Sequence, residues 1–257
     1  MSRRAEPSLL PEPDRPILPN QRPGLPTSNR CANPQPTRMT SRRYDLIVFD
    51  WDGTLFDSTA LIASCIQQAC RDLGITVPSQ ADAAFVIGLG LNDALAHAAP
   101  GLAPERYPEL ARRYRHHYFA DQHAITLFAG VAELLVELKQ RQHWLAVATG
   151  KSRLGLNSAL DTSELRHVFD ATRTADETAS KPHPQMLHEL MAELGVDAER
   201  TLMIGDTTHD LQLAANAGTA AIGVSYGAHS HEALQALAPL AVARTVAELR
   251  DVLMGTV

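Results

Sequence analysis

The sequence has little lysine, few cysteines and no long apolar run. None of its apolar runs approaches the roughly 20 residues needed to cross a bilayer, so we expect no membrane span. The three cysteines, Cys31, Cys65 and Cys70, leave one unpaired in any disulfide scheme, and none has zinc-ligand spacing. Free thiols are typical of a reducing compartment. We therefore expect a cytoplasmic protein.

Positive charge is also scarce, and it is nearly all arginine. The formal net charge is −6, which argues against a nucleic-acid partner because general nucleic-acid binders carry a basic footprint. Only three of the 23 basic residues are lysine: Lys139, Lys151 and Lys181. The ammonium of lysine is a compact point charge, whereas the guanidinium of arginine is a planar fork, so the two fit different sites. We therefore expect lysine at these positions to meet a need for a compact ammonium.

Residues 1–43 differ in composition from the rest of the chain. They hold nine of the 16 prolines and carry eight arginines against three acids, without a hydrophobic period. Such a segment buries too little apolar surface to offset its ordering entropy. We expect a disordered Pro- and Arg-rich extension, or a natural start at Met39, and neither a secretory signal nor an amphipathic transit helix.

Short apolar runs that stop at acids or glycine recur after residue 43, and helical patterns such as 131–141 and 185–194 lie between them. The runs cover residues 45–50, 144–149, 201–205 and 220–224. This alternation predicts an α/β fold with a doubly wound, mainly parallel, Rossmann-like sheet. Residues 58–127 show helical patterns and no buried strand. We therefore expect a core of residues 44–57 and 128–257 with an all-helical insertion at 58–127.

Carboxylates follow two of the expected strands. Asp50 and Asp52 end the first run, two residues apart and so on one side of an extended strand end. Asp206 and Asp210 follow the run at 201–205. Ligands bind beyond the carboxyl ends of strands in open α/β sheets, and hard carboxylates suit Mg²⁺. The sequence therefore predicts a magnesium site at this edge.

Hydrogen-bond donors follow the run at 144–149. Thr149, Gly150 and Lys151 offer a hydroxyl, backbone amides and an ammonium at the start of a helix, which is a natural anion site. Lys181 stands before a proline at the opening of another helix. Such donors would serve phosphoryl oxygens, where charge sits in the transition state.

Each segment has a plainer interpretation on its own. An acid after a strand is often only a helix N-cap, and a P-loop would need glycine where Leu145 stands. We expect four histidines to be solvated, since nothing near them completes a metal set: His116, His117, His229 and His231. The occurrence of all four segments in this order nevertheless outweighs the separate alternatives.

The ordered set resembles the motifs of haloacid dehalogenase-type phosphatases over essentially residues 44–257. Asp50-Trp-Asp-Gly-Thr54 matches the first motif, Thr149 the second, Lys181 the third, and Gly205-Asp206 through Asp210 the fourth. The helical insertion is similar to the cap domain of phosphoglycolate phosphatase-like members. The resemblance implies a Mg²⁺-dependent phosphomonoester hydrolase that acts on a small phosphorylated metabolite.

The resemblance also implies a role for each site residue. Asp50 would be the nucleophile that forms an aspartyl-phosphate, and Asp52 would act as general acid and then as general base. The metal ligands would be Asp50, Asp52 through its backbone carbonyl, Asp206 and Asp210. The phosphoryl group would be held by Thr54, Thr149, Gly150 and Lys181. The resemblance thus implies four catalytic residues: Asp50, Asp52, Thr149 and Lys181.

Rival functions differ in what they require. A dehalogenase on this fold needs neither Mg²⁺ nor a second acid, so Asp52 and Asp206 argue against it. A phosphosugar mutase would share the core and stays open, whereas a silent binding protein would have lost a catalytic residue.

Four arginines cluster within the insertion, and we expect most to be solvated and one to face the cleft: Arg106, Arg112, Arg113 and Arg115. Neither the substrate nor the oligomeric state is legible.

Overall fold

The computed structural model describes residues 43–256, so the expected extension lies outside the described residues apart from Arg43. The strands of the described chain are β1 (Leu46–Phe49), β2 (Trp144–Thr149), β3 (Ala171–Thr174), β4 (Thr201–Gly205), β5 (Ala220–Val224) and β6 (Ala241–Ala243). They form one parallel sheet in the order β3-β2-β1-β4-β5-β6. The prediction of a doubly wound parallel sheet is confirmed.

Helices connect the strands and also fill the insertion. Those of the insertion are α1 (Thr59–Asp72), α2 (Gln80–Phe85), α3 (Leu91–Ala98), α4 (Tyr107–Asp121) and the short 3₁₀ turns η1 (Pro104–Arg106) and η2 (Gln122–Ala124). Those of the core are α5 (Val131–Gln140), α6 (Arg153–Thr162), α7 (Gln185–Leu194), η3 (Ala198–Arg200), α8 (Thr208–Ala217), α9 (His231–Gln235) and α10 (Val246–Thr256). No helix among the described residues is long and apolar enough to span a bilayer.

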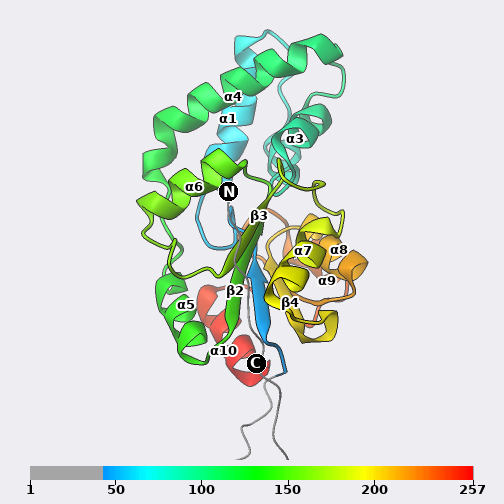
Figure 1. The fold of residues 1–257 in the computed structure, drawn as a ribbon. Coiled ribbons are helices and arrows are strands. Elements are labelled where there is room, and N and C mark those ends of the chain that lie inside the picture. Colours follow the sequence, from blue (N-terminus) through cyan, green and yellow to red (C-terminus); the bar gives the residue numbers. More distant parts are fainter. Residues whose placement is uncertain (1–42, 257) are drawn as a thin grey trace, which may run out of the picture. The chain divides into compact units, whose positions relative to one another are not determined.

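Alternate residues of each strand point to opposite faces of the sheet, and helices cover both faces. Ile47 and Phe49 pack in the same core cluster as residues of α5 and α10, whereas Leu46 and Val48 pack with residues of α7 and α8. Figure 1 shows α5 and α10 on one side of the sheet and α7 and α8 on the other. This layering leaves the carboxyl ends of the strands free to carry a site.

The helical insertion has an apolar core of its own. Residues of α1, α3 and α4, among them Ile66, Leu95 and Leu110, are at most 2% exposed and cluster together. The chain leaves and re-enters the core at one neck, where Phe56 and Leu127 form an antiparallel bridge. Beside it the Asp57 amide donates to the Thr126 carbonyl at 2.9 Å.

Candidate active site

Three buried carboxylates meet at the carboxyl ends of β1 and β4. Asp50 follows β1 and Asp206 follows β4, and these two strands are paired neighbours. Asp210 lies in the first turn of α8, where it forms a capping box with Thr207. One oxygen of each carboxylate lies within 4.8 Å of the others, and none of the three residues is exposed to solvent.

A single ammonium lies among these carboxylates. Lys181 Nζ is 2.7 Å from Asp50 Oδ1 and 2.6 Å from Asp210 Oδ1. Burial by itself would lower the pKa of Lys181, but Asp210 and Asp50 raise it above its usual value, so the side chain is charged. Burial raises the pKa of Asp50 to about 7 despite the opposing effect of Lys181. Burial and the charge of Asp50 likewise raise the pKa of Asp206 well above its usual range. Lys181 alone therefore does not stabilise the ionised forms of Asp50 and Asp206 fully.

The carboxylate oxygens differ in their hydrogen bonds. Asp210 Oδ2 accepts from the Thr207 amide at 3.0 Å and hydroxyl at 2.7 Å. Asp206 accepts from the Thr54 hydroxyl at 2.9 Å and from the Ala228 amide at 2.7 Å. Asp50 Oδ2 is buried and has no hydrogen-bond partner. A buried oxygen without a donor is costly, and a hard divalent cation would satisfy it. The residues of this cluster fit such a cation.

Close backbone packing shapes the Asp206 side of the site. Gly53 has φ +81°, and a Cβ there would lie 2.1 Å from Asp206 Oδ2. Only glycine combines this conformation with this contact. The sequence predicts that Thr54 binds phosphate; in the structure its hydroxyl donates to Asp206.

Thr149 and Gly150 end β2, the other neighbour of β1. The Thr149 hydroxyl is buried and accepts a hydrogen bond from the Lys151 amide at 3.2 Å. A Cβ on Gly150 would lie 2.3 Å from the Leu89 carbonyl oxygen and 2.6 Å from that of Gly88. The loop 86–90 of the insertion therefore rests directly on the backbone of Gly150.

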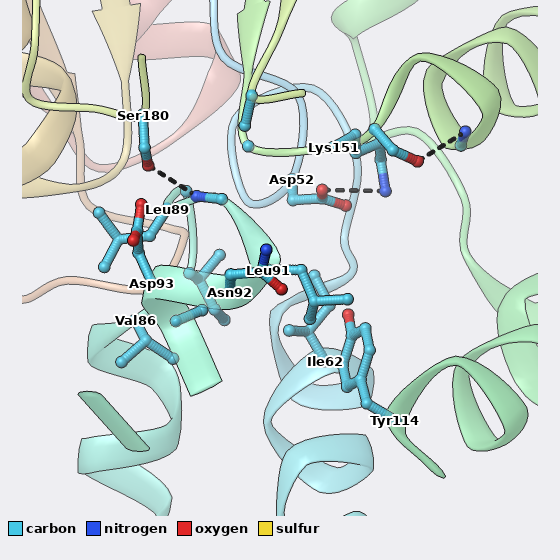
Figure 2. A pocket seen from close by; sticks show the side chains of 18 of the residues that line it. Asp52, Ile62, Val86, Leu89, Leu91, Asn92, Asp93, Tyr114, Lys151 and Ser180 are labelled. Carbon is cyan, nitrogen blue, oxygen red and sulfur yellow. Dashed lines mark hydrogen bonds and ion pairs between the residues drawn. The ribbon is translucent and has the colours of Figure 1, made fainter. Parts of the chain in front are cut away.

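Asp52 lines a cavity. Its Oδ2 lies 2.9 Å from Lys151 Nζ, and its Oδ1 accepts from the Ser58 hydroxyl at 2.7 Å. Lys151 Nζ also donates to the Tyr118 hydroxyl at 2.9 Å. Figure 2 shows Lys151 directed at Asp52. The sequence predicts Lys151 as a donor of an anion site; in the structure its ammonium lies against Asp52 and Tyr118.

The cavity lies between the core and the helical insertion and measures about 420 Å³. Apolar side chains dominate its wall, and Ile62, Leu91 and Tyr114 lie around it in Figure 2. Arg115 also lines it, and it is the only one of the four clustered arginines to do so among the described residues. The expectation that one of these arginines faces the cleft is met by Arg115.

The expectation that His229 is solvated is wrong. The residue is 7% exposed, its Nδ1 accepts from the Thr208 amide at 3.0 Å, and its ring stacks on Phe85 at 5.1 Å. His229 Nε2 and His209 Nε2 both lie within hydrogen-bond distance of the Phe85 carbonyl, at 3.0 and 2.8 Å. Phe85 ends α2, so the insertion itself covers His229. His116 is exposed as expected.

Comparisons with known proteins agree with this geometry. Residues 47–224 match the model of the haloacid dehalogenase-like hydrolase family. The chain is 38% identical to "Probable phosphatase IndB" of Dickeya dadantii, over 79% of this chain and 91% of the relative. It is 32% identical to a phosphoglycolate phosphatase of Vibrio cholerae, over 81% and 96%. The crystal structure of a predicted phosphoglycolate phosphatase from Haemophilus somnus superposes with a TM-score of 0.73 at 25% identity, over 82% of this chain and 99% of that one.

Proposed function

Because this chain belongs to the haloacid dehalogenase-like hydrolases and is a phosphatase, we propose that it hydrolyses a small phosphomonoester through an aspartyl-phosphate on Asp50, with Mg²⁺ as cofactor. The observation that carries this proposal is the Asp50 carboxylate. One oxygen is held by Lys181, the other is buried without a partner, and the group stands at the end of the central strand β1.

The residues can perform the two chemical steps in order. An oxygen of Asp50 attacks phosphorus, the ester P–O bond breaks, and the departing oxygen keeps the electron pair and takes a proton from Asp52. Asp52 then accepts a proton from a water molecule that attacks the phosphorus, which releases Asp50. Thr149, the Gly150 amide and Lys181 would hold the phosphoryl oxygens. Bound Mg²⁺ would offset the charge of Asp50, Asp206 and the phosphoryl group.

The cavity beside Asp52 would take the alcohol part of the ester. Its volume of about 420 Å³ lies within the range of about 300–1,000 Å³ typical of small-molecule sites. Arg115 supplies positive charge in its wall, which supports an ester with a second anionic group. Phosphoglycolate, the substrate in the name of the Vibrio cholerae relative, has such a group.

The test is to trap the intermediate. The full chain with Mg²⁺ and p-nitrophenyl phosphate is quenched in acid during turnover, and the phosphorylated residue is located by mass spectrometry. We expect phosphate on Asp50, and for Asp50→Asn neither phosphate nor turnover in a folded protein. Asp161→Asn, at an exposed ion pair with Arg166, is the matched control and should retain both. Phosphate on another residue, or sustained turnover by Asp50→Asn, would overturn the mechanism.

A further inference from the structure

The carboxylate of Asp52 is held at both oxygens. Ser58, the N-cap of α1, donates to Oδ1, while Lys151 lies against Oδ2. The side chains of Asp52 and Lys151 are only 11% and 10% exposed, so water screens their interaction weakly. Each carboxylate oxygen offers two lone-pair sites, so these contacts leave room for a proton while fixing the plane of the group.

Lys151 is in turn held by the insertion. Its ammonium donates to the Tyr118 hydroxyl and lies 5.0 Å from the centre of the Tyr118 ring, a cation–π contact. Tyr118 is on α4, which packs on α1, the helix that Ser58 begins. Ser58, where the insertion begins, thus contacts Asp52 directly. Tyr118, near the end of the insertion, contacts Asp52 through Lys151.

Lys151 has surroundings different from those of the other two lysines. Lys181 is fully engaged with Asp50 and Asp210, and Lys139 forms a surface pair with Asp170. The chain otherwise uses arginine for positive charge. A planar guanidinium would not fit the space between the Asp52 carboxylate and the Tyr118 ring as a compact ammonium does.

We propose that Lys151 is a positioning residue that, together with Tyr118, aims the Asp52 carboxyl at the oxygen of the leaving alcohol, so that the acid step depends on how the insertion is placed. This inference rests on the proposed role of Asp52. A general acid must lie within hydrogen-bond reach of its target, and a displacement of about 1 Å can cost roughly 10²-fold in rate. A neutral side chain at position 151 would leave the Asp52 carboxylate held by Ser58 alone, so its other oxygen could move away from the leaving alcohol.

Two substrates of similar size separate this role from substrate binding. The phenolate of p-nitrophenyl phosphate departs without a proton, whereas the alkoxide of p-nitrobenzyl phosphate needs one from Asp52. The quantity to compare is kcat/KM, because it reports the steps up to departure of the alcohol and is insensitive to later hydrolysis of the intermediate. Measurements use the full chain with Mg²⁺.

We expect Lys151→Gln to lower kcat/KM about 10- to 100-fold for the benzyl ester and much less for the phenyl ester. Tyr118→Phe keeps the ring and loses the hydroxyl, so it should show the same selectivity at about 3- to 10-fold, the size of one net hydrogen bond. Lys139→Gln is the matched control and should change neither substrate. Thermal unfolding of each variant identifies those that are folded, and Tyr118→Phe carries the test if Lys151→Gln is not.

Asp52→Asn completes a double-mutant cycle. If Lys151 acts through Asp52, Lys151→Gln should cause no further loss on the benzyl ester in the Asp52→Asn background. Equal losses on both esters, or losses that multiply in the double variant, would overturn the positioning role while leaving the phosphatase mechanism intact. If Asp52→Asn itself affected both esters equally, the proposed acid role of Asp52 would fail instead.

Discussion

Lys181 and Asp210 form a fully buried ion pair in which Nζ lies 2.6 Å from Oδ1 and neither side chain is exposed. The other oxygen of Asp210 accepts two hydrogen bonds from Thr207. Asp210 therefore has a donor on each oxygen, and it orients Lys181 toward Asp50. Asp206 also has a donor on each oxygen, but these donors are the neutral Thr54 hydroxyl and Ala228 amide. The charged partner Lys181 therefore distinguishes Asp210 from Asp206, although the sequence assigns both to the metal.

The first prediction separates these two aspartates by metal binding. At a Mg²⁺ concentration of about 100 Kd the wild type should gain roughly 2.7 kcal/mol, which corresponds to a rise in Tm of about 5–10 °C. Asp206→Asn should lose most of this rise, and Asp210→Asn should retain most of it. Differential scanning fluorimetry in EDTA and in MgCl₂ measures the shift. The assignment fails if Asp210→Asn abolishes the rise and Asp206→Asn does not.

The second prediction concerns the contact between the insertion and Gly150. Gly150→Ala would place a methyl group 2.3 Å from the Leu89 carbonyl oxygen, so the loop 86–90 must move away from the site. We expect kcat/KM for p-nitrophenyl phosphate to fall at least tenfold, because a shift of about 1 Å can cost roughly 10²-fold. Gly101→Ala is the control, since a Cβ there meets nothing within 4 Å. Equal activity of both variants would show that the loop yields without consequence.

The third prediction concerns Arg115. If this residue pairs with a second anionic group of the substrate, Arg115→Ala should lower kcat/KM for phosphoglycolate about tenfold, the size of one charged hydrogen bond. Hydrolysis of p-nitrophenyl phosphate should change much less. Arg112, whose side chain is 71% exposed and paired with Glu109, provides the control substitution Arg112→Ala. A preference for phosphoglycolate that survives in Arg115→Ala would assign specificity to another part of the cavity wall.

The fourth prediction is a pH dependence of stability that comes from His229. Burial lowers the pKa of His229 below its usual value, as it does for His209. The unfolded chain then binds the proton first as pH falls, so these residues cost stability below about pH 6.5. His229→Asn can still accept from the Thr208 amide and does not titrate. We expect the free energy of unfolding in urea and EDTA to fall less for this variant than for the wild type between about pH 7.5 and 5.5. His116→Asn, at an exposed position, should follow the wild type.

Much of the core was legible in the sequence because its strands are buried on both faces and end at chemically distinctive residues. The run at 201–205 and the helix at 185–194 have the predicted bounds. The edge strands β3 and β6 were not predicted. Arg173 lies within β3, where its guanidinium pairs with Glu189 and Glu193 on α7, so the strand lacks an apolar run. Strand β6 has only three residues.

The contacts that the insertion makes with the core could not be predicted from the sequence, for a different reason. Asp52, Lys151 and Tyr118 meet only because α4 comes to lie over the end of β2, and no local pattern encodes that approach. The burial of His229 likewise could not be predicted, since the residue that covers it, Phe85, is 144 residues away in the sequence. Motif order predicts which residues the sheet brings together, whereas contacts between the sheet and an inserted segment depend on packing.

The neck at Phe56 and Leu127 has a consequence for engineering. Since both ends of the insertion meet in a single backbone bridge, a foreign helical segment could be grafted between Asp57 and Leu127 without stretching any strand of the sheet. A library of such chimeras would vary the alcohol-binding wall while the phosphate chemistry stays constant. Donor segments would need a serine at their first cap and a hydroxyl-bearing aromatic residue within reach of Lys151. These two positions are the part of the interface that acts on Asp52.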